Sequence, residues 1–297
     1  MFTSGSLSRL TLLVLTVALT TSCISESSGE SSDPGASHEG PAGWELPLQA
    51  YMPSEEQVEL VADAREFLLS ACMARYGFSY EAAPELPSYG PETMTDLRYG
   101  IHDPAVVERY GYKPPIDLRA AREQETEALA TTALSAEEEA VMTGEPVGGA
   151  APAPDVPAGG CSGEADRAIV ATGEEPATLA AELSNDAYLR AQREPEVAAA
   201  FTSWSSCMAD RGFRYDHPMA PVDDPRFAVI DPSAAELATA EADLACREEH
   251  RVVETWYRAE VRLQEQAIER NFEQLDLERA RLAEAVRGAA GLLGTHS

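Results

Sequence analysis

The sequence predicts a mainly α fold: a disulfide-braced helical domain with a long C-terminal amphipathic helix, after a signal peptide and a disordered tether. Three observations predict it. The phrase CMARYGFSY at 72–80 returns as CMADRGFRY at 207–215, and apolar residues at helical spacing precede both copies. Four cysteines follow the N-terminal region, and an even number favours bridges. From 233 to 286 the chain contains neither Gly nor Pro, which is typical of uninterrupted helix.

The composition excludes one class of partner. The 297 residues include 22 basic and 51 acidic side chains, for a net charge of -29. Such a surface repels phosphate backbones, so we expect no nucleic-acid partner. The length is sufficient for a sizeable core.

Residues 1–22 have the features of a lipoprotein signal peptide. Arg9 is followed by the apolar run Leu10–Leu19, which spans about 15 Å of helix and is too short to cross a bilayer. The run ends in LTTSC, which resembles the lipobox of bacterial lipoproteins. That resemblance implies that Cys23 carries a diacylglycerol and becomes the mature N-terminus. Ordinary secretion and an uncleaved anchor remain alternatives.

The next segment, 23–50, is expected to be a flexible tether after the lipidated cysteine. Its part Ile24–Gly43 is rich in Ser, Gly, Pro and Glu, and cannot bury enough apolar surface to offset its ordering entropy. A helical body is expected over 51–232, and the long helix over 233–290.

The repeated phrase predicts two helix ends of one design. The first helix begins at a capping box formed by Ser54 and Gln57. Each phrase then places Gly at the left-handed C′ position of a Schellman turn, with Met at C3 and Phe at C″ in contact. The residues of this motif are Met73, Gly77 and Phe78 in the first copy, and Met208, Gly212 and Phe213 in the second.

The cysteines of the predicted mature chain, besides Cys23, are Cys72, Cys161, Cys207 and Cys246. In an oxidising compartment they are expected to form two disulfides. Because each copy of the phrase is followed by one more cysteine, we favour Cys72–Cys161 with Cys207–Cys246. Pairing across the repeat, Cys72–Cys207 with Cys161–Cys246, is the alternative. Zinc is a competing use of these thiols, but no Cys-x-x-Cys spacing occurs, and we expect no metal.

The remaining helices and loops are predicted from Gly/Pro-rich stretches, which interrupt helices, and from capping boxes, which begin them. A helix is expected over 117–143, with a capping box at Ser135 and Glu138. The Gly/Pro-rich stretch 144–160 is expected to be a loop, and helices resume over 162–172 and 177–193. The proline-rich link 216–232 is expected to run over the surface.

The long helix is expected to open at a capping box of Ser233 and Glu236. Its distal part carries apolar residues at heptad-like spacing, interrupted by Arg279. They are Ile268, Phe272, Leu275, Leu282 and Val286. We expect the proximal part to pack on its own domain, while the distal part either does the same, projects, or pairs with another chain.

No catalytic motif is present in the sequence, so no catalytic residue and no cofactor is predicted. His102 and His217 each lie beside an acid and a proline, and Asp223–Asp224 is a weak cation candidate. For these the simpler expectation is loop hydrogen bonding. Trp204, Trp256 and Tyr257 are expected in the core, with a ligand groove as the alternative.

The lipobox, the paired Cys-Met-x-x-x-Gly phrases, RYG with GY, and EADLAC followed by Trp together resemble a group of actinobacterial (Streptomyces-type) cell-envelope lipoproteins. The resemblance covers most of the mature chain. It implies a lipid anchor on the outer face of the cell membrane and disulfides, and assigns no catalytic residue.

From location and architecture we expect a membrane-tethered structural or interaction protein of the cell envelope that is not an enzyme. The long C-terminal helix is its expected surface for an envelope protein partner. A lipoprotein that binds a small molecule or cation is the alternative, and an envelope hydrolase is a third hypothesis.

Overall fold

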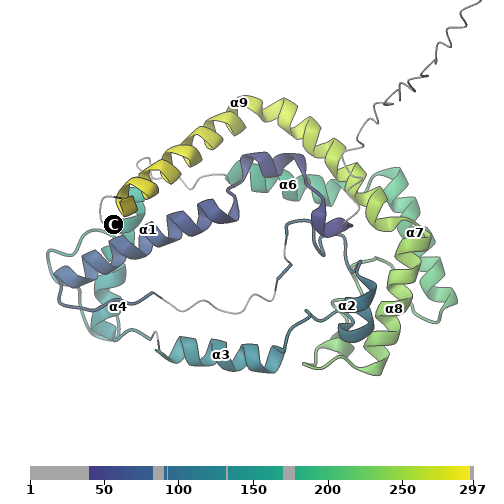
Figure 1. Cartoon of the computed structure of the whole chain (residues 1–297), viewed down its shortest axis with the longest axis horizontal. Helices are drawn as coiled ribbons and strands as arrows, with labels where there is room; N and C mark the ends of the chain where they lie inside the picture. The colour runs from purple at the N-terminus through teal and green to yellow at the C-terminus, as the bar shows by residue number, and fades with distance from the viewer. Residues whose placement is uncertain (1–39, 83–89, 92, 132, 170–177, 295–297) are drawn as a thin grey trace, which may run out of the picture. The chain divides into compact units, whose positions relative to one another are not determined.

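Helices joined by turns make up the structure, which is a computed structural model (Figure 1). It describes residues 40–82, 90–91, 93–131, 133–169 and 178–294, all within the unit Ser37–Ser297. In these ranges the extended structure is one isolated bridge, Val147 to Ala150. The predicted signal peptide and Cys23 lie outside the described residues.

The predicted mainly α fold is confirmed. The described elements are η1 Pro41–Gly43, η2 Pro47–Tyr51, α1 Glu55–Arg75, α2 Pro104–Tyr110, α3 Leu118–Thr131, α4 Ala136–Thr143, α5 Gly160–Ile169, α6 Thr178–Ala191, α7 Pro195–Asp210, η3 Pro225–Phe227, α8 Ala234–Glu249 and α9 Val252–Gly294. The predicted helix over 117–143 is therefore two helices, and Ser135 caps the second of them.

Two of the three predicted capping boxes are complete. At α1, Gln57 N donates to Ser54 Oγ at 3.3 Å while Ser54 N donates to Gln57 Oε1 at 3.1 Å. The α4 box is equivalent. At α8 only half of the box forms. Glu236 N donates to Ser233 Oγ, but the Glu236 carboxylate is buried and accepts from Tyr112 N at 3.3 Å.

Both copies of the repeated phrase form the predicted helix end. Gly77 and Gly212 have φ of +84° and +93°. Phe78 N donates to Met73 O at 3.2 Å, and Phe213 N donates to Met208 O at 2.9 Å, which is the hydrogen bond that defines a Schellman turn. Each Phe also packs in the apolar cluster that contains its Met.

The two disulfides join each copy to the next cysteine downstream. Cys72 pairs with Cys161 across a Cα–Cα distance of 5.6 Å, and this bridge ties α1 to α5. Cys207 pairs with Cys246 across 5.8 Å and ties α7 to α8. The pairing that we favoured is therefore confirmed, and pairing across the repeat is wrong.

The long C-terminal helix is confirmed, but it begins later than predicted. The chain breaks at the C-cap His250 and at Arg251, whose φ of +50° is left-handed. Neither Gly nor Pro marks this break in the sequence. α9 also bends at Asn271, where φ is -121° and the side-chain amide donates to Ala267 O.

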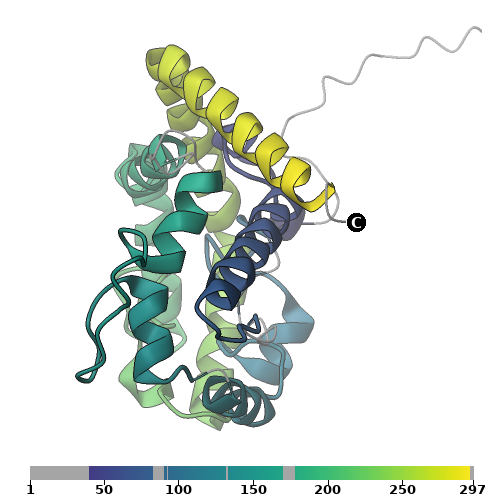
Figure 2. The ribbon, with the colours of Figure 1, turned by 90° about the vertical axis from the view of Figure 1, so that its left-hand side faces the viewer.

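The distal part of α9 packs on its own domain. α9 contacts α6 and then α1, and Figures 1 and 2 show its C-terminal part lying across α1. Leu275 and Leu282 are buried in these contacts. Most of the heptad-like apolar face is thus used within the chain, and among its members Phe272 is the exposed one, at 54%.

The tether boundary predicted at residue 50 is wrong. Leu46 and Leu48 are fully buried, and η2 packs against α6 and α9. The composition of Ile24–Gly43 is that of a tether, but the apolar residues that follow it belong to the core.

Candidate ligand-binding pocket

A cavity of about 410 Å³ lies between α2 with its flanking loops, the loop after α7, and α8. This volume is within the range of about 300–1,000 Å³ that is usual for small-molecule pockets. The lining is mainly apolar, and its larger aliphatic side chains are Leu97, Ile101, Val106, Val107, Ile116 and Val222. We refer to this cavity as the α2–α8 pocket.

A buried ion pair on α8 lies beneath the pocket. Asp243 and Arg247 are one helical turn apart, and Asp243 Oδ1 is 2.6 Å from Arg247 Nε. Asp243 also accepts from Trp204 Nε1 at 2.8 Å and from the Tyr112 hydroxyl at 3.1 Å. Burial, and then the charge of Asp243, raise the pKa of Tyr112 far above its usual value, so the phenol stays a donor.

Arg247 extends the same network to the loops of the pocket wall. Its guanidinium donates to the backbone carbonyls of Tyr99 and Pro218. One buried pair on α8 therefore holds α7, the loops on both sides of α2, and the loop after α7. Removing either partner would leave an uncompensated buried charge, a change that typically costs about 3–5 kcal/mol.

Gly100 makes this approach possible. Its φ is +96°, and a Cβ there would lie 2.3 Å from an Arg247 guanidinium nitrogen. Any other residue would displace the arginine and strain the backbone. The RYG triplet at 98–100 is thus explained by the close contact between this loop and α8.

The charged side chains around the pocket are engaged within the chain. His102 Nε2 lies 2.7 Å from Asp96 Oδ1. Lys113 lies 3.5 Å from Glu236 and donates to Phe227 O, while Asp103 caps α2. Because these charges already have partners, the pocket is suited to a molecule that is mainly apolar.

His217 is not a ligand or a base in this arrangement. Its ring packs edge-on against Phe201 and Trp256, and Met219 N donates to its Nδ1 at 3.1 Å. Burial, and then the charge of Arg247, lower the pKa of His217, which keeps the ring neutral at pH 7.

The Asp223–Asp224 pair does not converge on a cation position. Asp224 accepts from the Tyr215 hydroxyl at 2.7 Å and from Arg226 at 2.6 Å. The hydrogen bonds from Arg226 hold the pKa of Asp224 far below its usual value, so its carboxylate is occupied.

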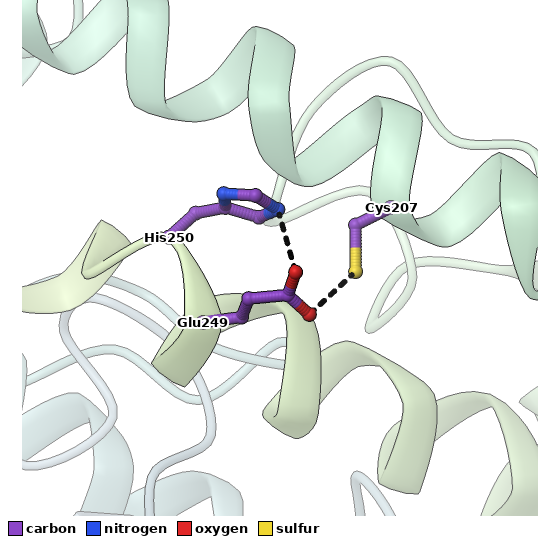
Figure 3. A group of neighbouring side chains, drawn as sticks. All are labelled: Cys207, Glu249 and His250. Atoms are coloured by element: carbon purple, nitrogen blue, oxygen red, sulfur yellow. Dashed lines mark hydrogen bonds and ion pairs between the residues drawn. The ribbon is translucent and has the colours of Figure 1, made fainter.

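The one His/Cys/Asp/Glu cluster in the described part of the chain with metal-like spacing lies at the second disulfide (Figure 3). Glu249 lies 3.8 Å from Cys207 Sγ and 3.9 Å from His250 Nε2. The Cys207 sulfur is bonded to Cys246, so it is not a thiolate ligand. Glu249 and His250 alone are too few for a structural zinc site.

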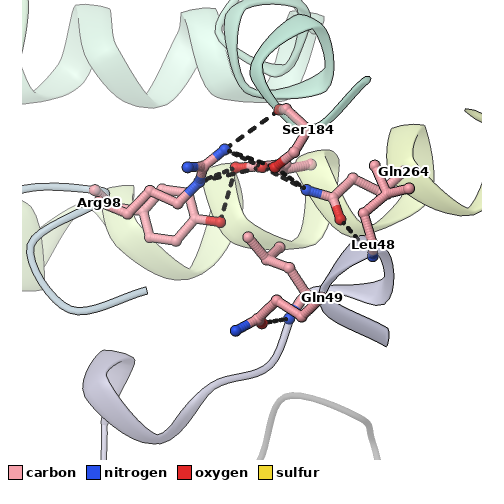
Figure 4. Close-up of polar contacts among 8 residues, drawn as sticks. Leu48, Gln49, Arg98, Ser184 and Gln264 are labelled. Atoms are coloured by element: carbon pink, nitrogen blue, oxygen red, sulfur yellow. Dashed lines mark hydrogen bonds and ion pairs between the residues drawn. The ribbon is translucent and has the colours of Figure 1, made fainter. Parts of the chain in front are cut away.

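A second buried network fixes the segment that precedes α1 (Figure 4). Arg98 pairs with the buried Glu260 at 2.7 Å. Gln264 donates to Glu260 at 2.8 Å and accepts from Leu48 N at 3.0 Å. Because α9 holds η2 in this way, the attachment point of the predicted tether is part of the rigid core.

Trp204, Trp256 and Tyr257 are buried, as expected. The sequence did not predict the pocket itself. Its signal was present in the fragments RYG, GY and EADLAC, whose residues Tyr99, Gly100, Tyr112 and Asp243 meet around Arg247. Because these fragments are far apart along the chain, the sequence alone did not show that they meet.

In the described residues, no helix is both long and apolar enough to cross a membrane. Comparison with known proteins found no matching family model, no similar curated protein and no similar solved structure.

Proposed function

We propose that this chain is an extracytoplasmic lipoprotein, tethered through Cys23 to the outer face of the cell membrane, that binds a small and mainly apolar molecule in the α2–α8 pocket. The observation that carries the proposal is the pocket: an apolar cavity of about 410 Å³ whose neighbouring charged side chains are paired within the chain, apart from Asp103, which caps α2. Small-molecule sites have this combination of apolar walls and few fixed polar groups.

The use of α9 supports ligand binding over the interaction function that we first expected. A partner helix needs an unoccupied apolar face. Here Leu275 and Leu282 are buried against the chain itself, and Phe272 and Leu277 are the large apolar side chains of α9 that are left exposed. A structural or interaction role remains the alternative, with crosslinking in intact membranes as its test.

A neutral apolar dye, N-phenyl-1-naphthylamine, tests the pocket directly. We expect one saturable site per chain, seen as enhanced dye fluorescence. Val106→Trp fills the pocket and should abolish this signal. The matched control is Val229→Trp, because Val229 is 54% exposed and does not line the pocket.

An unchanged signal in Val106→Trp, with the fold verified by circular dichroism, would refute the pocket as the site. The tether is tested separately by mass spectrometry of the native protein. A diacylglycerol on Cys23, and processing blocked by globomycin, are expected; an unmodified N-terminus would contradict the anchor.

A further inference from the structure

Leu97, at the pocket wall, combines two unfavourable features. Its φ of +57° places it in the left-handed region, which Leu rarely occupies. Its side chain is also 42% exposed, although it is large and apolar. Packing within the chain therefore gives only partial compensation for the strained backbone.

The chain on both sides holds Leu97 in this conformation. On one side, Asp96 N donates to Thr93 Oγ1 at 3.1 Å, and the Asp96 carboxylate contacts His102. On the other side, Arg98 pairs with Glu260, and Gly100 N donates to Leu97 O at 2.9 Å. Strain that is fixed in this way is characteristic of ligand-contacting positions.

Exposure distinguishes the mouth of the pocket from its interior. Leu97 and Val222 both line it and are 42% and 46% exposed, so they mark the mouth. Val107 and Arg247 are buried and mark the interior. An elongated apolar ligand with one end in the interior would cover both mouth residues and remove their apolar surface from water.

The charges at the mouth indicate the sign of the ligand's polar end. Among the charged lining residues, Asp103 is exposed, whereas Lys113 and Arg247 are 17% and 2% exposed and are paired with carboxylates. The net charge of the whole chain is -29. An anionic head group at the mouth would be repelled, and a neutral or cationic one would not.

We propose that the pocket binds a single-chain alkyl amphiphile tail first, with Leu97 and Val222 holding the chain at the mouth and a neutral or cationic head group outside. This proposal rests on the proposed function and specifies its ligand class. Leu97 is then the residue that selects for chain length, because it contacts the part of the alkyl chain that leaves the pocket.

The first experiment measures displacement of N-phenyl-1-naphthylamine by alkylamines, alcohols and carboxylates, from hexyl to decyl, below their micelle concentrations. We expect each added methylene to tighten binding about three- to fourfold until the chain passes the mouth. Amines and alcohols should bind more tightly than carboxylates of the same length. A flat length series, or a preference for carboxylates, would overturn the proposal.

The second experiment separates the Leu97 side chain from its backbone strain. Leu97→Ala removes the side-chain contact with the ligand but leaves a residue with a Cβ in the left-handed conformation. Leu97→Gly removes both the contact and the backbone strain. Both should weaken decylamine binding about 5- to 30-fold. The Gly variant should have a midpoint of thermal unfolding about 2–4 °C above that of the Ala variant.

Arg251 provides the matched control, because it is the other non-glycine residue with positive φ in the described chain and it does not line the pocket. Arg251→Gly should likewise be more thermostable than Arg251→Ala, and neither should change decylamine binding.

If decylamine binds to the parent protein, and Val106→Trp blocks it, while Leu97→Ala binds normally, this inference is wrong and the proposed function stands. If neither the dye nor any amphiphile binds to the parent protein, the proposed function itself fails.

Discussion

The two copies of the repeated phrase form the same helix end in two different surroundings. Both have the left-handed glycine, the Met–Phe contact and the disulfide. The first lies in a small cluster of buried residues: Leu69, Cys72, Met73, Val141, Cys161 and Ala165. The second lies in the largest cluster, which includes Met208, Trp204 and Trp256. The short phrase thus specifies the local turn. How far the stability of that turn depends on its disulfide is set by the apolar cluster around it, which residues far away in the sequence form.

The largest effect is expected from removing the first disulfide. Cys72 and Cys161 are 89 residues apart, so replacing both with Ala should lower the free energy of unfolding by about 4–5 kcal/mol. Because the surrounding cluster is small, α1, α4 and α5 should lose amide-exchange protection together. Protection that stays unchanged there would show that the bridge is not what holds this region.

A smaller loss is expected from removing the second disulfide. Cys207 and Cys246 are 39 residues apart, and the double Ala variant should lose about 4 kcal/mol. Trp204 still bonds to Asp243 across the same two helices, so α7 and α8 should keep their exchange protection at low denaturant. Selective opening of α7 and α8 would contradict the contrast between the two regions.

Replacing either motif glycine, Gly77 or Gly212, with Ala should lower stability by the same amount. A Cβ at Gly77 or Gly212 meets nothing within 4 Å, so the cost of Gly→Ala at either position comes from the left-handed backbone alone. We expect each variant to lose about 1–2 kcal/mol in denaturant unfolding. A difference above about 1 kcal/mol would mean that the two turns are not equivalent.

The smallest expected effect is a difference in stability loss between two serine variants. Ser70 and Ser205 each lie two residues before one copy of the phrase. Ser205 Oγ donates to Tyr215 O at 2.7 Å, whereas Ser70 is exposed. Ser205→Ala should cost about 1 kcal/mol, and Ser70→Ala less than about 0.5 kcal/mol. If urea titrations gave the same loss of unfolding free energy for both variants, the predicted difference between the two serines would be wrong.

Local rules predicted the helix ends, two complete capping boxes and the disulfide pairing, because each depends on residues a few positions apart or on the repeat itself. The break at His250–Arg251 was missed because no Gly or Pro marks it. The Glu236 side chain was misassigned because its partners, Tyr112 and Lys113, are more than a hundred residues away. The pocket was missed for the same reason: Gly100 acquires its role only where Arg247 approaches it.

The disulfides also have a consequence for resistance to proteases. The bridge Cys72–Cys161 encloses 96–116, and the bridge Cys207–Cys246 encloses 218–222, so both loop walls of the cavity lie inside covalent rings. Exposed loop tips are the usual sites of nicking. A single cut within either ring leaves both fragments joined through sulfur, so neither wall can be lost by one cleavage.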